Sequence, residues 1–351
     1  MPDPVLTRAI DTLCSGDSLT EDQAAEVLSE IMHGEVSEIQ IAGFLIALRT
    51  KGETVQELAG LARVMRELAA PVVVDRDDLL DTAGTGGGRS SFNVSTTAAL
   101  IAAGAGCAVA KHGNRSATSR SGSADLLEAL GARIDLGPEQ VAECIREAGF
   151  GFMFAPTHHQ ATRYVIPVRR ELAVRTIFNM LGPLTNPAGA RRQLIGVSDP
   201  GFLHTMAGAL ALLGVDRALV VSAEDGLDEI SAGAPTQVVE VNGEELTSYV
   251  LTPEEAGLGA TVETPPGGSP EQNAALTQAI LRVDGRPDGP VAGEELALIN
   301  AGAAIYVAGA AGSIAEGVEA ARAALSEGRA AEALSRYVAA THKLAPVQSR
   351  R

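Results

Sequence analysis

Two loops rich in glycine, hydroxyl groups and basic residues carry most of the chemistry that this sequence can express. The first runs Asp81-Thr-Ala-Gly-Thr-Gly-Gly-Gly88 and leads to Phe92-Asn-Val-Ser-Thr96. The second runs Lys111-His-Gly-Asn-Arg-Ser-Ala-Thr-Ser119 and continues through Arg120-Ser-Gly-Ser123. Glycine lets backbone N–H groups approach an anion closely, and a helix N-terminus adds unpaired N–H groups. Basic and hydroxyl side chains supply charge and further donors. The two loops therefore predict sites for two separate phosphate groups.

The first loop alone leaves an alternative open, because a Gly-Thr-Gly-Gly run is often only a tight turn ahead of a helix. It lacks the Gly-Lys-Ser/Thr ending of a P-loop and the three spaced glycines of a dinucleotide-binding fingerprint. The second loop adds the cations Lys111 and Arg115 together with several serines. Their presence favours phosphate binding over a purely structural turn.

The elements around these loops alternate between short apolar stretches and helical ones. We expect strands at 72–74, 79–83, 107–111, 151–155, 193–198, 217–222 and 236–241, with helices at 95–104, 124–130, 138–148 and 202–213. Further helices are expected near 271–282, 291–309, 314–326 and 328–341. The alternation predicts an α/β fold with a largely parallel sheet. Ligands of such sheets bind beyond the carboxyl ends of the strands, where Gly84 and Lys111 both fall.

The first seventy residues are expected to be helical only. Three capping boxes follow one another, beginning at Thr20, Ser37 and Thr54, and each precedes apolar residues at helical spacing. Pro71 ends this region.

Composition and charge exclude several classes of protein. The 351 residues carry a formal charge of −17, whereas binding to a nucleic-acid backbone needs a basic surface, so no nucleic-acid partner is expected. The most apolar run, 98–110, is too short and too rich in glycine to span a membrane, and the N-terminus does not resemble a secretory signal. Cys14, Cys107 and Cys144 have no disulfide or metal pattern and indicate a cytoplasmic location.

The order of the motifs resembles the anthranilate phosphoribosyltransferases of tryptophan biosynthesis, within the nucleoside phosphorylase-like phosphoribosyltransferases. The matching blocks occur in family order: Gly84-Thr-Gly-Gly87, Asn93-Val-Ser-Thr96, Lys111-His-Gly-Asn-Arg115, Pro167-Val-Arg-Arg-Glu-Leu172, Arg175-Thr-Ile-Phe-Asn179, Leu181-Gly-Pro-Leu-Thr-Asn-Pro187 and Gly226-Leu-Asp-Glu-Ile-Ser231. The resemblance implies a small all-helical domain, 1–71 plus 165–187, on the anthranilate side of a cleft. It implies a large α/β phosphoribosyl-binding domain, 72–164 plus 188–351, with a mostly parallel central sheet flanked by helices. A homodimer through the N-terminal helices is implied as well.

The implied reaction is Mg²⁺-dependent transfer of the phosphoribosyl group from phosphoribosyl pyrophosphate to the amino group of anthranilate, with no covalent intermediate. By the resemblance, Lys111, Asp228 and Glu229 are catalytic, and Ser95, Asp228 and Glu229 hold the metal. Anthranilate is bound by Gly84, Asn114 and Arg169. The phosphoribosyl donor is bound by Gly84, Gly87, Gly88, Ser91, Asn93, Val94, Ser95, Thr96, Lys111, His112, Gly113, Asn114, Arg115, Ser119 and Ser123. His112, His158 and His159 are candidates for the aromatic entrance.

Other interpretations compete with these assignments. The family loop has an aspartate after Gly-Thr-Gly-Gly, whereas this chain has Gly88 and Arg89, which leaves open whether one or two Mg²⁺ ions bind. Without its context, the Asp228-Glu229 pair could be a solvated loop, and Arg169 could pair with Glu171. A nucleoside phosphorylase would bind inorganic phosphate without the acidic pair, and a nucleic-acid-binding relative would have lost the substrate pocket.

Overall fold

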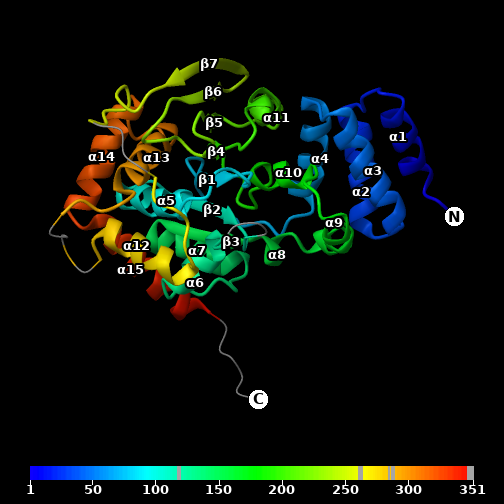
Figure 1. Cartoon of the computed structure of the whole chain (residues 1–351). Helices are drawn as coiled ribbons and strands as arrows, with labels where there is room; N and C mark the ends of the chain where they lie inside the picture. The colour runs from blue at the N-terminus through cyan, green and yellow to red at the C-terminus, as the bar shows by residue number, and fades with distance from the viewer. Residues whose placement is uncertain (117–119, 260–263, 284, 286–288, 346–351) are drawn as a thin grey trace.

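The computed structural model describes residues 1–116, 120–259, 264–283, 285 and 289–345. Within these residues a central sheet has the strand order β3-β2-β1-β4-β5-β6-β7, with helices on both faces (Figure 1). The five strands from β3 to β5 are parallel, and β6 and β7 are antiparallel. This confirms the mostly parallel α/β sheet. The strands are β1 (Leu80–Gly84), β2 (Val109–Gly113), β3 (Phe150–Phe154), β4 (Arg192–Gly196), β5 (Arg217–Ala223), β6 (Thr236–Asn242) and β7 (Glu245–Leu251).

The chain reverses its direction of travel across the sheet at β1. From β1 it passes through α5 (Val94–Gly104) to β2, then through α6 (Ser123–Ala129) and α7 (Pro138–Ala148) to β3. It returns to β4 on the other side of β1. A crevice forms outside the carboxyl ends of parallel strands where the strand order reverses. The two predicted phosphate loops leave β1 and β2 at this edge.

The N-terminal region forms the predicted helices, α1 (Pro4–Cys14), α2 (Glu21–His33), α3 (Glu38–Lys51) and α4 (Val55–Glu67). Reciprocal capping boxes begin α2 at Thr20 and α4 at Thr54. Only one of the two hydrogen bonds of the capping box predicted at Ser37 is present. The Ser37 hydroxyl does accept from the Gln40 N–H, but the Gln40 side chain bonds to the backbone of Asp3 instead of returning to Ser37.

The structure corrects one strand prediction and adds one strand that was not predicted. Residues 72–74 form no strand, and the Val72 N–H donates to the carbonyl of Pro187 instead of to a sheet partner. The edge strand β7 was missed because its side chains are mostly exposed and polar, so it lacks an apolar pattern. A signal was present, since Asn242-Gly243 is typical of a tight hairpin turn.

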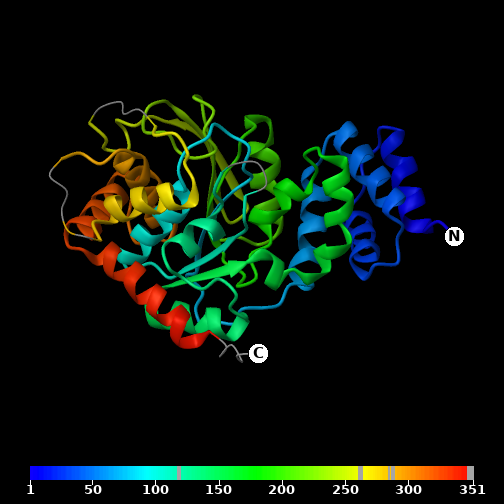
Figure 2. The same ribbon diagram turned by 60° about the horizontal axis from the view of Figure 1, so that its bottom comes forward.

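Helices cover the two faces of the sheet with two hydrophobic cores. One face packs against α5, α6, α7, α12 (Pro270–Leu281), α13 (Glu294–Val307), α14 (Ile314–Ser326) and α15 (Arg329–Leu344). The other face packs against α11 (Leu203–Leu212), which joins α1–α4, α9 (Ile166–Leu172) and α10 (Phe178–Leu184) in the second core. Figure 2 shows α1–α4 and the C-terminal helices on opposite sides of the sheet. Short segments α8 (Ala155–His158), η1 (Gln160–Tyr164) and η2 (Pro200–Phe202) complete the chain.

Helices α13 and α14 approach each other closely because glycine faces glycine across their contact. A Cβ at Gly302 would lie 2.6 Å from the backbone nitrogen of Val318, and a Cβ at Gly317 would overlap the carbonyl of Gly302. Close approach of this kind requires residues without side chains. It accounts for part of the chain's high glycine content.

Two further sequence predictions concern the cysteines and membrane-spanning helices. Cys14, Cys107 and Cys144 are free thiols, the last two of them buried. Among the described residues, no helix combines the length and the apolar character needed to cross a bilayer.

Candidate active site

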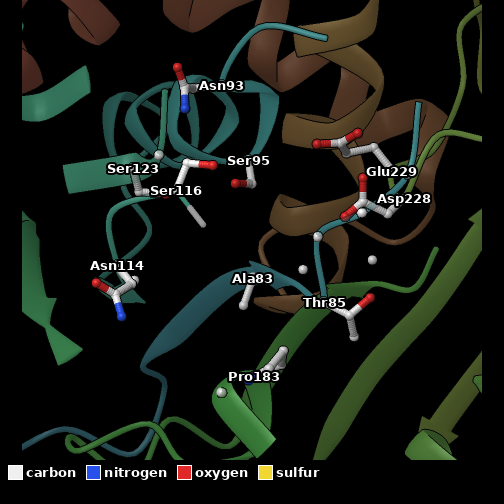
Figure 3. A pocket seen from close by; sticks show the side chains of 18 of the residues that line it. Ala83, Thr85, Asn93, Ser95, Asn114, Ser116, Ser123, Pro183, Asp228 and Glu229 are labelled. Atoms are coloured by element: carbon white, nitrogen blue, oxygen red, sulfur yellow. The ribbon is translucent and has the colours of Figure 1, made fainter. Parts of the chain in front are cut away.

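A cleft of about 400 Å³ opens at the carboxyl edge of the sheet. Figure 3 shows the acidic pair Asp228-Glu229 on one side of it and Ser95 and Ser123 of the two loops on the other. Most of the predicted site residues line this cleft: Gly84, Gly87, Gly88, Ser91, Asn93, Val94, Ser95, Lys111, His112, Gly113, Asn114, Arg115, Ser123, Arg169, Asp228 and Glu229. Thr96 does not, because its side chain is fully buried away from the cleft. Ser119 lies outside the described residues, so its assignment stays a prediction.

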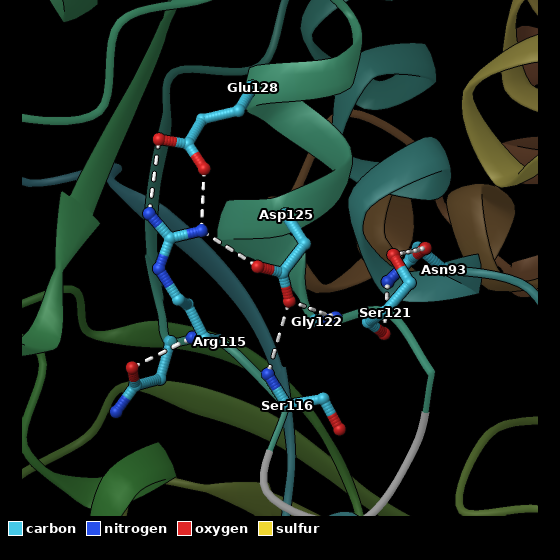
Figure 4. A network of polar contacts seen from close by, with 8 residues as sticks. Asn93, Arg115, Ser116, Ser121, Gly122, Asp125 and Glu128 are labelled. Carbon is cyan, nitrogen blue, oxygen red and sulfur yellow. Dashed lines mark hydrogen bonds and ion pairs between the residues drawn. The ribbon is translucent and has the colours of Figure 1, made fainter. Parts of the chain in front are cut away.

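The side chain of Asn93 joins the two phosphate loops. Its amide donates to the carbonyl of Ser121 at 3.0 Å and its oxygen accepts from the Ser121 hydroxyl at 3.1 Å (Figure 4). Asn93 is also the N-cap of α5, yet it makes no side-chain capping bond there. The Val94 N–H donates to the carbonyl of Phe92, whereas the N–H groups of Ser95 and Thr96 receive no bond from the Asn93 side chain and can serve an anion.

Lys111 places a buried ammonium group at the base of the cleft. The side chain is 1% exposed, and its nitrogen donates to the carbonyl of Thr82 and lies 3.4 Å from the Ser95 hydroxyl. Burial lowers the pKa of Lys111 to about 8, while the charges of Asp81 and Glu229 act in the opposite direction. The group is therefore mostly charged at neutral pH and suits a phosphate ligand.

Asp228 and Glu229 form a half-buried acidic pair after β5. Burial raises the pKa of both carboxyl groups, and the charge of Asp228 raises that of Glu229 further, whereas Lys111 lowers it. Two adjacent carboxylates in this setting favour a bound cation. Among the described residues, no group of three or more His, Cys, Asp or Glu side chains could hold a metal alone. The pair fits Mg²⁺, which often takes one or two carboxylates and completes its shell with phosphate and water.

Glycines around the acidic pair leave room only for hydrogen. A Cβ at Gly196 would overlap the carbonyl of Asp228, and a Cβ at Gly88 would lie 2.8 Å from a carboxylate oxygen of Asp228. Gly84 also faces this carboxylate. The loop 84–88 therefore packs directly on the acidic pair.

Asn300 on α13 was not identified from the sequence, although it lines the cleft. Its side chain accepts from the N–H of Ile230 at 3.0 Å and donates to the carbonyl of the same residue at 2.8 Å. Ile230 directly follows the acidic pair. Since the partners lie seventy residues apart in the chain, no local pattern could have predicted the contact.

Arg169 lies on the helical side of the cleft. Its guanidinium carbon is 5.4 Å from the centroid of the Phe178 ring, and burial lowers its pKa. None of the ion pairs formed by the described residues involves Arg169, so the alternative pairing with Glu171 is not observed. A cation beside an aromatic ring, with Asn114 and Pro183 in the same cleft, suits a flat acid.

Of the three histidines proposed for the aromatic entrance, only His112 lines the cleft. A His112 ring nitrogen is 3.1 Å from the carbonyl of Gly182, and one of His159 is 3.0 Å from the carbonyl of Thr185. Burial lowers the pKa of His112 to about 3 and that of His159 to about 4. Both rings are therefore neutral at pH 7 and tie α10 to the sheet side of the cleft.

Two arginines near the loops have partners that the sequence did not reveal. Arg115 forms ion pairs with Asp125 at 2.8 Å and Glu128 at 2.5 Å (Figure 4), so its role as a phosphate ligand stays a prediction. Arg175 belongs to a matched family block, but the sequence did not indicate a role for it. It lines the cleft and donates to backbone carbonyls of the glycine loop.

Comparison with known proteins agrees with this geometry. Residues 76–331 match the model of the glycosyl transferase family, a/b domain, and residues 7–69 match that family's helical bundle domain. An anthranilate phosphoribosyltransferase from Rubrobacter xylanophilus is 51% identical over 344 residues, covering 97% of this chain and 99% of the relative. The chain belongs to the anthranilate phosphoribosyltransferase family. A second relative of this name, from Thioalkalivibrio sulfidiphilus, is 49% identical over 96% of this chain and 98% of its own length.

Solved structures of the family have the same fold. The crystal structure of anthranilate phosphoribosyltransferase from Thermus thermophilus matches with a TM-score of 0.88 at 50% identity, over 95% of this chain and 99% of that one. The Saccharomyces cerevisiae enzyme in complex with PRPP and Mg matches with a TM-score of 0.87 at 24% identity, over 97% and 99%. The family and the enzyme class predicted from the motif order are thus confirmed. The domain division at 71, 165 and 187 stays a prediction.

Proposed function

We propose that this protein transfers the phosphoribosyl group of phosphoribosyl pyrophosphate to the amino group of anthranilate, giving N-(5-phosphoribosyl)anthranilate and pyrophosphate. One observation carries the proposal: two phosphate-type loops, a half-buried acidic pair and Arg169 beside an aromatic ring all line one cleft. Relatives named for this activity, about half identical over nearly their whole length, support it.

The donor would be held at both of its anionic ends. Loop and helix N–H groups at 84–96, with the ammonium of Lys111, suit phosphate oxygens. Asp228 and Glu229 would hold Mg²⁺, with the Ser95 hydroxyl as a third candidate ligand. The bound ion would neutralise charge that develops on the departing pyrophosphate. The yeast structural neighbour, reported in complex with PRPP and Mg, supports this arrangement.

The acceptor would lie on the helical side of the cleft. Arg169 would bind the carboxylate of anthranilate, with Asn114 and the backbone of Gly84 beside it. An aryl amine is unprotonated at neutral pH and attacks through its own lone pair, so the enzyme needs to supply placement more than a strong base. Direct transfer without a covalent intermediate follows from this chemistry.

A homodimer through the helical region is part of the proposal. Ile39 is 85% exposed on α3, and Ile46 on the same helix and Ile166 on the neighbouring α9 are exposed as well. Exposed apolar side chains grouped on packed helices are typical of an interface. Analytical ultracentrifugation measures the oligomeric state. The cytoplasmic location stays a prediction.

The reaction is tested by mixing the protein with anthranilate, phosphoribosyl pyrophosphate and Mg²⁺ and following the loss of anthranilate fluorescence. Loss that needs all three components supports the proposal. Release of a base from a pyrimidine nucleoside by inorganic phosphate, with no loss of anthranilate, would instead indicate a nucleoside phosphorylase. Retardation of nucleic acid in a gel at physiological salt, with no turnover, would indicate the binding-protein alternative.

A further inference from the structure

Arg175 links the helical side of the cleft to the glycine loop. It lies between α9 and α10, and its guanidinium donates to the carbonyl of Gly86 at 2.7 Å and to that of Thr85 at 3.2 Å. A Cβ at Gly87 would overlap this guanidinium, so the side chain packs directly on the backbone of the loop. One side chain thus holds two consecutive carbonyls.

Because Arg175 holds these two carbonyls, peptide geometry determines where the N–H groups of the same peptide units point. In a trans peptide the carbonyl and the N–H of the same unit point in opposite directions, and no described peptide bond is cis. The carbonyls of Thr85 and Gly86 share their units with the N–H groups of Gly86 and Gly87. Arg175 therefore turns these two N–H groups away from itself. The Gly86 N–H accordingly lies on the side of Asp228 and lowers the pKa of its carboxyl group.

The loop can adopt this orientation because of its glycines. Gly86 and Gly87 have φ values of 61° and 89°, a region that side chains disfavour. Consecutive N–H groups on one side of such a turn form a concave site for an anion. Without an anchor, a loop of this composition would sample many conformations, since glycine has the largest backbone freedom.

Arg175 is itself held in place by a residue of the N-terminal helices. The Arg49 guanidinium on α3 donates to the carbonyl of Arg175 at 2.8 Å. Arg49, Arg175 and the loop thus form a chain of contacts from the N-terminal helices to the phosphate site.

We propose that Arg175 is a positioning residue for the phosphoribosyl donor: it holds the carbonyl side of Thr85–Gly87 so that the Gly86 N–H faces the Asp228 carboxylate and the Gly87 N–H faces the pyrophosphate. The inference rests on the proposed function and adds a residue to it. Arg175 acts here through the loop backbone, which distinguishes it from the catalytic residues.

The test compares Arg175→Ala and Arg175→Lys with Arg170→Ala, which removes an equally exposed arginine from α9. Donor and anthranilate binding are measured by calorimetry with Mg²⁺ present, alongside KM for each substrate and the thermal midpoint. We expect Arg175→Ala to weaken donor binding about 10- to 150-fold, the range for lost hydrogen bonds to a charged group, with anthranilate KM unchanged. Arg175→Lys should recover only part of the loss, because an ammonium cannot hold two carbonyls in a fixed fork. Added guanidinium ion at low millimolar concentration should restore part of the Arg175→Ala affinity.

The outcomes separate the two proposals. If the wild-type protein does not bind the donor, the proposed function is rejected and this inference with it. If the wild type binds but Arg175→Ala binds equally well, the inference alone is rejected. An equal rise in both KM values, with a fall in the thermal midpoint, also rejects it, since that would indicate a general loss of structure.

Discussion

The Asn300 side chain hydrogen-bonds to both backbone polar groups of Ile230. It accepts from the Ile230 N–H at 3.0 Å and donates to the Ile230 carbonyl at 2.8 Å. Asn300 is only 2% exposed, so water does not compete for these bonds. Because Ile230 directly follows Glu229, a side chain on a long helix fixes the peptide that carries the acidic pair. The candidate metal ligands are therefore positioned by the scaffold.

Replacing the acidic pair, Asp228→Asn with Glu229→Gln, should remove Mg²⁺-dependent turnover. The carboxylates are the ligands that the ion prefers, and losing several kcal/mol of charge stabilisation would slow the reaction at least about 100-fold. Turnover is measured against Mg²⁺ concentration. Glu224→Gln is the matched control, since this exposed glutamate precedes the pair. Unchanged rates in the double variant would refute the metal assignment.

Arg169→Ala should raise the KM for anthranilate far more than the KM for the donor. A hydrogen bond to a charged group contributes about 1.5 to 3 kcal/mol, so the anthranilate constant should rise about 10- to 150-fold. Steady-state kinetics with each substrate varied in turn provide the measurement. Arg170→Ala serves as the control. An equal rise in both constants would show that Arg169 is not the carboxylate anchor.

The titration of Lys111 should appear in the pH profile. Its pKa is about 8 in the folded protein, so above this pH the ammonium loses its charge, and kcat/KM for the donor should fall about tenfold per pH unit. Lys111→Arg keeps a charge at all these pH values, and its profile should stay level to about pH 10 even if the rate is lower. A wild-type profile that is level from pH 7 to 10 would contradict the assigned role.

The Gly88→Asp variant restores the aspartate that the family has at this position, and it tests how the lack of that aspartate affects this chain. Its Cβ would lie 2.8 Å from an Asp228 carboxylate oxygen and 2.9 Å from the carbonyl of Gly226, so the loop must shift. We expect a loss of about 1 to 3 kcal/mol in unfolding free energy and a several-fold rise in the Mg²⁺ concentration for half-maximal activity. Gly259→Ala is the control, because nothing lies within 4 Å of its Cβ position. An unaltered Mg²⁺ requirement would mean that the aspartate is dispensable in this chain.

Stability should fall as the pH drops below about 6.5, because His112 and His159 are buried in the neutral form. Their pKa values are about 3 and 4 in the folded state and near 6.5 when unfolded, so the unfolded chain binds protons first. The loss at pH 5 is about 2 kcal/mol for each ring. Urea denaturation at pH 7 and pH 5 measures it. His159→Gln should reduce the difference between the two pH values by about that amount, whereas the exposed His204→Gln should not. Equal differences in all three proteins would rule out the histidine origin.

The sequence predicts what local patterns encode. Buried strands, capping boxes at Thr20 and Thr54, and loops rich in glycine and hydroxyl groups all have local signals, and they lie where expected. The strand predicted at 72–74 was wrong, because β-branched residues favour a strand only where a sheet partner is present. The edge strand β7 was missed because its exposed side chains carry no apolar period.

Contacts between distant segments could not be predicted in this way. Arg175 and Asn300 act on backbone groups that lie far away in the chain, so their partners appear only once the fold is known. Thr96 shows that a matched motif does not by itself place a side chain in the cleft. It belongs to a matched block, yet its place on α5 turns its side chain into the core, while its neighbour Ser95 lines the cleft.

The glycine contact between α13 and α14 has a consequence beyond packing. Gly302 sits two residues from Asn300 on the same helix, so any side chain added at 302 would push α13 off its neighbour and carry the Asn300 amide with it. Through Ile230 that displacement would reach Glu229 and disturb the two carboxylates that we propose as metal ligands. A glycine contact between two helices thus limits how accurately the acidic pair can be placed.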